Sequence, residues 1–142
     1  LENAEFVRFG VMHKNTYLNS PQLLDKHFNL RSNKRFYFAG QMTGVEGYVE
    51  SAASGLMAGL AAARAVLELP EVEFPDVTAH GALANYISNP AIENFQPMNI
   101  NFGLIPPLTV RIRKKREKNA QIAARALEAL DGFLPVLKTE QA

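Results

Sequence analysis

The sequence contains no cysteine among its 142 residues. A chain without thiols forms no disulfide bond, holds no zinc ion through thiolates and has no cysteine nucleophile of its own. Proteins of reducing compartments need no disulfide bonds. The absence is compatible with the cytoplasm, which is where we expect this protein to work.

Long hydrophobic runs are also missing. The longest apolar stretch, residues 55–69, is interrupted by Arg64 and Glu68, whereas a membrane-spanning helix needs about 20 consecutive apolar residues. The first eight residues carry Glu2 and Glu5, where a signal peptide has a basic region followed by an apolar run. We therefore expect neither a membrane span nor a signal peptide. Because the first residue is not methionine, we expect it to be an internal position of a longer chain.

The charged residues divide the chain into two parts. Residues 1–107 hold seven Lys or Arg against ten Asp or Glu, and residues 108–142 hold eight against four, which together give the net charge of +1. Six of the basic residues fall within residues 111–118. Such a cluster is either a solvated helix face or a surface that contacts phosphates.

The pattern of apolar residues predicts two strands. The segment 35–40 (RFYFAG) is largely apolar without alternation, which is typical of a strand buried on both faces of a parallel sheet. Residues 1–12 alternate in part and predict a second strand. Between them we expect a polar loop at 13–21 and, at 22–30, either a short helix or an irregular crossing.

A glycine-rich turn at residues 40–48 (GQMTGVEGY) predicts the start of a helix that runs to residue 69, where Pro70 ends it. Small residues recur at every fourth position of this helix and form two smooth ridges, Ser51, Gly55, Gly59 and Ala63 in one and Ser54, Ala58 and Ala62 in the other. A glycine inside a helix costs about 1 kcal/mol relative to alanine. The ridges therefore indicate either the close approach of a backbone or cofactor, or tight packing of the helix on a sheet.

The remainder of the chain is expected to be mainly helical. Thr78 predicts the N-cap of a helix that ends near residue 88. Residues 89–107 are rich in proline and asparagine and predict an ordered, extended loop. A final helix is predicted from residue 110 to 130, with Gly132 as its stop.

These elements are too few for a self-sufficient fold. A buried parallel strand needs neighbouring strands and helices on both faces of the sheet, and this sequence offers one convincing strand and a second candidate. We therefore predict an α/β fold whose sheet is completed by another part of the same protein. Self-association into a homo-oligomer is the alternative way of covering the open sheet edge.

The turn at residues 40–48 has the strongest functional signal. The N-terminus of a helix presents unpaired N–H groups and a partial positive charge, and glycines let a ligand approach the backbone. Such an end binds a phosphate or stabilises negative charge on a reduced flavin ring. The spacing of Gly40, Gly44 and Gly47 does not match the dinucleotide fingerprint G-x-G-x-x-G, so a purely structural turn is the alternative.

Three stretches of the sequence resemble one known family. Residues 40–64 (GQMTGVEGYVESAASGLMAGLAAAR) are similar to the C-terminal flavin-binding motif of the folate-dependent tRNA methyltransferases called TrmFO. Residues 8–24 (RFGVMHKNTYLNSPQLL) and 95–108 (FQPMNINFGLIPPL) resemble two further signatures of that family. The resemblance covers nearly the whole chain in the right order. A sister family of flavoproteins, which modify the wobble uridine of tRNA, shares a similar turn and helix, but the HKNTY and QPMN-x-NFG strings favour TrmFO.

The resemblance implies the C-terminal part of a glutathione-reductase-like FAD-binding fold, with a strand, a glycine turn and a long helix followed by a helical tail. Residues 1–77 would belong to the FAD-binding domain, and residues 78–142 would form a helical extension packed on it. The implied enzyme takes a one-carbon unit from methylenetetrahydrofolate, reduces it with NAD(P)H through FAD and places the methyl group on C5 of a T-loop uridine in tRNA. The family's reactive cysteines and its N-terminal glycine motif are not in these residues. We therefore expect the chain alone to be inactive and predict no catalytic residue in it.

Carried over to this chain, the resemblance assigns contacts with the FAD isoalloxazine and ribityl groups to the residues of the turn: Gly40, Gln41, Met42, Thr43, Gly44, Val45, Glu46, Gly47 and Tyr48. His13, Asn15 and Tyr17 are expected to face the flavin or the folate, with a plain loop as the alternative. Arg113 and Lys115 of the basic cluster are expected to contact tRNA phosphates.

Some alternatives stay open at this point. The amides of Asn99 and Asn101 either recognise a pterin or base edge or satisfy the backbone of an irregular loop. His27 and His80 have no second ligand at metal spacing, so we predict no metal site. The whole chain has one alternative from a different class, a stand-alone module that binds RNA or a protein partner and retains an old flavin-domain helix.

Overall fold

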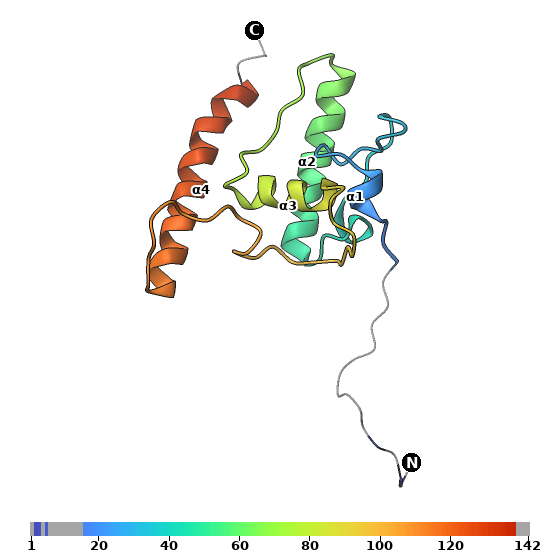
Figure 1. Ribbon diagram of the computed structural model, residues 1–142. Helices are drawn as coiled ribbons and strands as arrows, with labels where there is room; N and C mark the ends of the chain where they lie inside the picture. The colour runs from blue at the N-terminus through green and yellow to red at the C-terminus, as the bar shows by residue number, and fades with distance from the viewer. Residues whose placement is uncertain (1, 4, 6–15, 139–142) are drawn as a thin grey trace.

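The computed structural model describes residues 2–3, 5 and 16–138. Within these residues, five helical segments follow one another along the chain: α1 (Ser20–Leu23), the 3-10 helix η1 (Gly40–Thr43), α2 (Tyr48–Val66), α3 (Ala79–Ser88) and α4 (Lys115–Lys138). Helix α3 lies crosswise between α2 and α4, which stand on either side of it (Figure 1). None of the helices in the described part of the chain is both long and apolar enough to cross a membrane.

The main core lies where α1, α2 and α3 meet the glycine-rich turn. Its buried side chains are Leu24, Phe28, Val45, Met57, Ala58, Leu83, Ala84, Ile87 and Phe95. A second, smaller cluster of Ala82, Ile105 and Ile122 joins α4 to α3. Full burial of a large apolar side chain stabilises by about 1.5–3 kcal/mol, so α1, α2 and α3 are held more firmly than α4. The domain boundary between residues 77 and 78 stays a prediction, and the main core takes side chains from both sides of it.

The long helix predicted after the glycine turn is confirmed as α2, which ends at Val66 rather than at residue 69. Beyond Val66, Glu68 adopts a φ of 55°, in the left-handed region that commonly terminates helices. The Leu69 N–H then donates to the Arg64 carbonyl oxygen at 2.9 Å. The chain has therefore left the helix before it reaches Pro70.

The buried parallel strand predicted at residues 35–40 is wrong for the described part of the chain. Phe36 is 55% exposed, and Tyr37 makes only an isolated antiparallel bridge with Asn29. A strand buried on both faces needs hydrogen-bonded neighbours on both sides, and within the described residues this segment has such pairing on one side. The helices of the predicted α/β fold are observed and its parallel sheet is not. The strand predicted at residues 1–12 falls almost entirely outside the described residues.

Residues 22–30 form the irregular crossing rather than a helix, because α1 ends at Leu23. Leu24 and Leu30 are paired by an isolated antiparallel bridge. Phe28 has a φ of 65°, which is unusual for a bulky side chain. Its ring is completely buried, so the free energy of burying the ring offsets the backbone strain.

Helix α3 begins at the predicted position because Thr78 caps it. The Thr78 Oγ1 atom accepts a hydrogen bond from the Gly81 N–H at 3.0 Å, as N-cap side chains do. No helix forms between the end of α3 at Ser88 and the start of α4 at Lys115. The loop predicted at 89–107 is confirmed, since no helix falls within it and its only bridge among the described residues is made by Met98.

Helix α4 differs from the prediction at both ends. It begins at Lys115 rather than at residue 110 and continues through Gly132 to Lys138. The side chain of Phe133 is 8% exposed and packs on Phe74, with the ring centroids 4.8 Å apart. This contact lies beyond the predicted stop and favours continuation of the helix.

Candidate functional site

The glycine-rich turn is the point where the three stretches that carry the family resemblance meet. The Leu18 N–H donates to the Met42 carbonyl oxygen at 2.8 Å. On the other side, the Met98 N–H donates to the Gly44 carbonyl oxygen at 2.9 Å, and the Glu46 N–H donates to the Met98 carbonyl oxygen at 3.1 Å. The turn is therefore held from two sides by main-chain hydrogen bonds to segments far away in the sequence.

Three glycines give the turn its shape. Gly40, Gly44 and Gly47 have φ angles of 67°, 82° and 93°, in the region that side chains rarely adopt. A Cβ atom on Gly44 would also come within 2.6 Å of Cε1 of the Phe95 ring, and one on Gly47 within 2.6 Å of the Asn99 amide nitrogen. These requirements arise within the chain itself, so the glycines alone do not demand a ligand.

Ser54 ties the turn to α2, a role that the sequence analysis did not identify. Its buried Oγ accepts from the Gly40 N–H at 2.8 Å and donates to the Ser51 carbonyl oxygen at 2.8 Å. Thr43 Oγ1 adds a bond to the Gly40 carbonyl oxygen at 2.7 Å. The sequence indicates this role only through a serine that stands between Ala53 and Gly55 in the helix after the turn.

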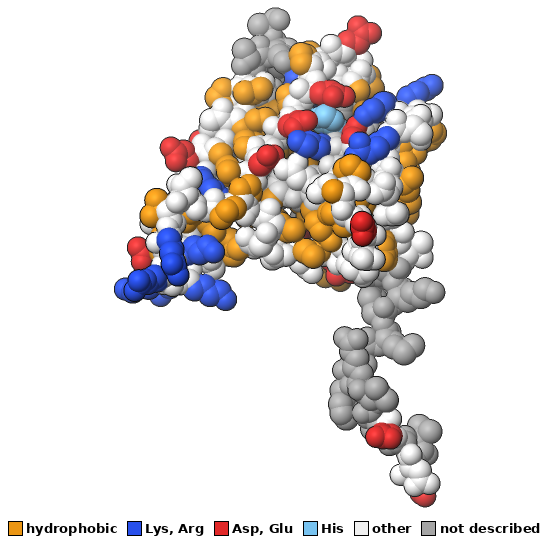
Figure 2. Space-filling view, viewed as in Figure 1, with side chains coloured by type: hydrophobic (Ala, Val, Ile, Leu, Met, Phe, Trp, Pro, Cys, Tyr) orange, Lys and Arg blue, Asp and Glu red, His pale blue; other side chains and the backbone are white. Residues whose placement is uncertain are grey.

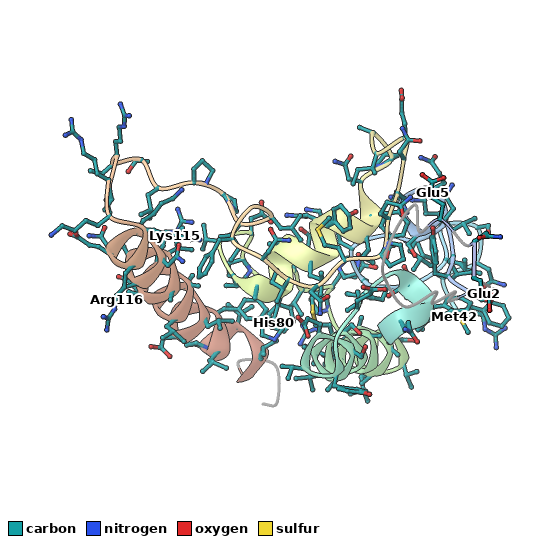
Figure 3. The ribbon with its side chains drawn as sticks, turned by 90° about the horizontal axis from the view of Figure 1, so that it is seen from below. Glu2, Glu5, Met42, His80, Lys115 and Arg116 are labelled. Atoms are coloured by element: carbon teal, nitrogen blue, oxygen red, sulfur yellow. The ribbon has the colours of Figure 1, made fainter. Side chains whose placement is uncertain are left out.

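The N-terminus of α2 has a glycine N-cap, with the Glu50 carboxylate and the Asn99 amide beside it. Its N-cap is Gly47, which offers no side chain to the first amide groups of the helix, so these N–H groups can donate to another acceptor. Tyr48 is 98% exposed and Met42 is 52% exposed, and Met42 stands on the side of the molecule away from α4 (Figure 3). Glu50 lies in the first turn of the helix, where a carboxylate complements the helix dipole. The arrangement can accept hydrogen bonds from, and donate them to, a polar ring.

The two ridges of small residues on α2 have different surroundings. Ser54 and Ala58 are buried against the main core. A Cβ atom added to Gly55 or Gly59 would meet nothing within 4 Å, so this part of the other ridge faces open space. Close packing explains the ridge of Ser54 and Ala58. Among the described residues, no contact explains Gly55 and Gly59.

The residues predicted to face flavin or folate are only partly described. His13 and Asn15 lie outside the described residues. Tyr17 lies beside the turn, with its ring edge against Phe95 at a centroid distance of 6.1 Å. Phe95 was not predicted as a site residue, although it supports both Tyr17 and Gly44.

The basic cluster lies away from the turn. All six of its side chains are exposed, and none of the ion pairs found in the described residues involves them. They gather at the beginning of α4 (Figure 2), where Lys115 and Arg116 are labelled on the side opposite Met42 (Figure 3). The structure therefore does not bring Arg113 and Lys115 together with the residues predicted to hold FAD.

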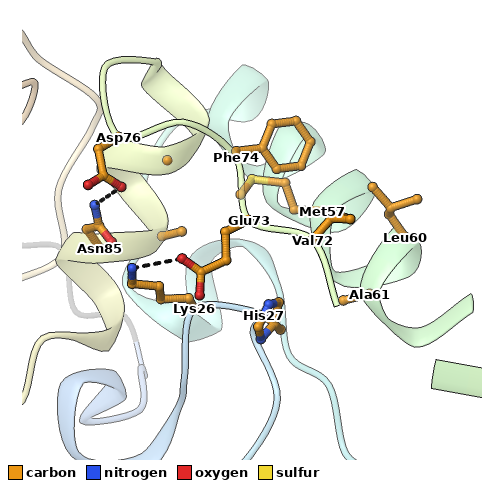
Figure 4. Close-up of a pocket in the computed structure, with 12 residues that line it drawn as sticks. Lys26, His27, Met57, Leu60, Ala61, Val72, Glu73, Phe74, Asp76 and Asn85 are labelled. Carbon is orange, nitrogen blue, oxygen red and sulfur yellow. Dashed lines mark hydrogen bonds and ion pairs between the residues drawn. The ribbon is translucent and has the colours of Figure 1, made fainter. Parts of the chain in front are cut away.

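A small cavity between α2, α3 and residues 72–76 is bordered by one ion pair and one hydrogen bond between side chains (Figure 4). Lys26 Nζ lies 3.0 Å from Glu73 Oε2, and this hydrogen bond raises the pKa of Lys26. The Asn85 amide donates to Asp76 at 2.8 Å. The cavity holds about 20 Å³, room for a water molecule and no more, so it is not a cofactor site.

Elsewhere, polar side chains form hydrogen bonds with backbone groups of the protein itself. The Asn101 amide donates to the Asn99 carbonyl oxygen at 3.2 Å, and its oxygen accepts from the Gly103 N–H at 2.9 Å. These bonds support the structural interpretation of Asn101. Within the described residues, no three side chains of the metal-binding types come together.

Comparison with known proteins identifies close relatives. A sequence model of the family described as glucose inhibited division protein A matches residues 1–70. The methylenetetrahydrofolate–tRNA-(uracil-5-)-methyltransferase TrmFO of Desulfitobacterium hafniense (strain Y51) is 59% identical over 133 residues, which are 94% of this chain and 30% of that protein. The proteins of the same name from Pelotomaculum thermopropionicum and Halalkalibacterium halodurans are 58% and 56% identical, over 96% and 94% of this chain and 31% of each relative.

The similarity to these relatives extends through all three stretches that meet at the glycine turn, because it covers 94–96% of the chain. The chain spans less than one third of the length of each relative. Over nearly its whole length, the chain is therefore similar to about one third of the length of proteins named TrmFO.

Proposed function

We propose that this chain is the C-terminal, FAD-contacting part of a cytoplasmic tRNA (uracil-5-)-methyltransferase that uses methylenetetrahydrofolate. The observation that carries the proposal is the convergence on one turn of the three resembling stretches, through the hydrogen bonds of Leu18, Met98 and Glu46. The names of the relatives describe this activity for proteins about three times as long. The proposed substrate is a T-loop uridine of tRNA.

In this proposal, residues 40–48 hold the isoalloxazine and ribityl groups of FAD. The N-terminus of α2 suits this role, because its N-cap, Gly47, has no side chain to bond the first N–H groups, which can then donate to the polar edge of the ring. FAD would supply the reducing equivalents, taken from NAD(P)H, that convert the folate's one-carbon unit to a methyl group. The chain's own part is to orient the ring and to stabilise negative charge on it through the positive end of the helix.

Two further contacts belong to the proposal. Tyr17 lies beside the turn and, with His13 and Asn15 of the same segment, would face the flavin or the folate. Arg113 and Lys115 would contact tRNA phosphates from the exposed basic cluster. The reactive thiols must come from the part of the protein outside this chain, because the chain has no cysteine.

A second candidate is a flavoprotein that modifies the wobble uridine of tRNA. The match of residues 1–70 to the glucose inhibited division protein A family is compatible with either flavoprotein. The 56–59% identity to proteins named TrmFO favours the methyltransferase. The position of the modified uridine distinguishes the two.

The test uses the longer protein that contains this chain. The purified protein should show a flavin spectrum that NAD(P)H bleaches and methylenetetrahydrofolate restores, and it should form 5-methyluridine in a tRNA transcript. Digestion of the product to oligonucleotides would locate the modified base. A colourless protein that FAD cannot reconstitute would refute the proposal and favour the non-catalytic module.

One substitution tests the turn itself. Tyr48 is almost fully exposed, so Tyr48→Ala should leave the folding of this chain unchanged and weaken FAD retention about tenfold if the ring packs beside it. Leu67→Ala, at the other end of α2 and 66% exposed, is the matched control. Equal FAD occupancy in the two variants would place the flavin elsewhere.

A further inference from the structure

An apolar trough runs across the face between α2 and α4. It consists of two adjoining cavities of about 590 and 330 Å³. Both cavities are lined by Ala79, His80 and Ile100, so the trough is continuous from α4 across the beginning of α3 to the first turns of α2. Figure 3 shows His80 between α4 and α2, in the middle of this surface.

The side chains at the floor of the trough are buried, and those at its rim are exposed to solvent. On the floor, Ile122 is 1% exposed and Met57 is 6% exposed. On the rim, Leu127 is 64% exposed and Phe102 is 46% exposed. Folded monomers seldom leave such contiguous apolar surface in water unless it is an interaction site.

The apolar lining is interrupted by three polar residues, Glu50, Asn101 and His80, and His80 lies in both cavities. Its ring stacks on Phe74 with a centroid distance of 5.0 Å, and its Nδ1 atom is buried without a hydrogen-bond partner among the described residues. Burial lowers the pKa of His80, so the neutral ring is favoured. Because Nδ1 is inaccessible from the surface, the neutral ring contributes to the trough as an aromatic surface.

We propose that the trough is the seat of a polypeptide segment from the part of the same protein that lies outside this chain. The inference rests on the proposed function, in which this chain is one part of a longer enzyme. The relatives are covered to 30–31%, so about 70% of their length is available to supply the segment. The docked segment is apolar and packs over the His80 ring and the apolar side chains beside it.

The shape of the trough favours a polypeptide over a small molecule. Sites for small ligands enclose about 70–90% of the ligand surface, whereas here Leu127 and Phe102 stand exposed on the rim. The polar groups that would orient a small ligand are also few, because the Asn101 amide is already bonded to the backbone. A helix or strand laid along the trough would cover the whole apolar surface at once.

Thiol labelling of the full-length protein tests the proposal. The chain has no cysteine, so each introduced cysteine is the only one in its tryptic peptide. Ala123→Cys and Leu127→Cys place a thiol in the trough. Gln121→Cys and Glu128→Cys are the matched controls, because they are exposed positions on α4 outside the trough and fall in the same tryptic peptides, 119–125 and 126–138.

The native protein is treated with a maleimide, and the labelled fraction of each peptide is followed by mass spectrometry. We expect the thiols at positions 123 and 127 to react about 100-fold more slowly than their controls, through rare local opening. The slow rates should not change with protein concentration. Equal rates in trough and control would overturn the proposal, and so would protection that appears only at high concentration, because that result assigns the trough to a second copy.

The flavin spectrum of the same preparations separates this proposal from the proposed function. Protected thiols in a protein without flavin would support the docked segment and contradict the flavoenzyme. A yellow, active protein whose trough thiols react as fast as the controls would support the enzyme and overturn the docking.

Discussion

The glycine turn and helix α4 are held in the fold in different ways. The turn is fixed by main-chain bonds to two distant segments and by the buried side chains of Val45 and Phe95. Helix α4 depends on Ile122, on Phe133 and on Arg125, whose guanidinium donates to the carbonyl oxygens of Pro106 and Pro107. The turn is therefore formed by the chain itself, whereas α4 leaves an apolar trough uncovered.

This difference separates a region that the chain forms by itself from a surface that we propose another part of the protein covers. A ligand binds more tightly to a site that is rigid before the ligand arrives. The turn is held rigid by contacts within this chain. The surface beside α4 leaves apolar side chains exposed to solvent, as expected of a face that packs on another part of the protein. The four predictions that follow compare the two regions, beginning with the largest effect.

Replacing Phe95 with alanine should have the largest effect. The ring is 7% exposed and supports Gly44, Tyr17 and Tyr86, so Phe95→Ala should lower the free energy of unfolding by about 3–5 kcal/mol. Leu134→Ala on α4 is the control, since that side chain is 47% exposed. Urea unfolding of the full-length protein measures both. Equal losses would mean that the turn is not the more firmly held region.

Glycine substitutions sharpen the same comparison. Gly44→Ala should lower the free energy of unfolding by about 1–3 kcal/mol through backbone strain, because a φ of 82° is unfavourable for alanine. The added Cβ also collides with the Phe95 ring, which adds to this loss. Gly132→Ala inside α4 meets nothing within 4 Å and should stabilise the helix by up to about 1 kcal/mol. Thermal unfolding measures both variants, and a destabilising Gly132→Ala would show that another segment packs closely there.

Reversing two charges of the basic cluster should weaken tRNA binding. The double variant Arg113→Glu, Lys115→Glu removes two phosphate contacts, so affinity should fall about tenfold at low salt. The slope of log affinity against log salt concentration should also become smaller. Arg35→Glu, an exposed cation away from α4, is the control. Unchanged affinity of the double variant would leave the cluster as a solvated surface.

The smallest effect concerns pH. Burial lowers the pKa of His80 below the ordinary value of 6.5. Well above pH 6.5 the ring is neutral in both the folded and unfolded states, so it contributes no pH dependence there. Below pH 6.5 the unfolded chain takes up the proton more readily, and the free energy of unfolding should decrease until the folded ring is also protonated. His80→Phe should remove this part of the pH dependence in urea titrations, and an unaltered profile would contradict the assignment to His80.

Local patterns were sufficient to predict several elements. Helix α2 follows from the glycine turn and the long apolar run, and α3 follows from the Thr78 cap. The predicted strand at 35–40 and the predicted end of α4 at Gly132 were wrong. Both depend on distant partners, namely the neighbours that a strand must have and the Phe74 ring on which Phe133 packs, and sequence periodicity does not reveal such partners.

The sequence by itself determined that residues 40–48 form a glycine turn before a long helix, since only glycine adopts the required φ angles at low energy. It also carries the similarity to TrmFO proteins, which extends over 94–96% of the chain. Only the tertiary structure brought Leu18 and Met98 to that turn, placed the basic cluster away from it, and opened a trough around His80. These features arise from packing between residues far apart in the chain, where the free energy depends on three-dimensional neighbours and not on sequence spacing.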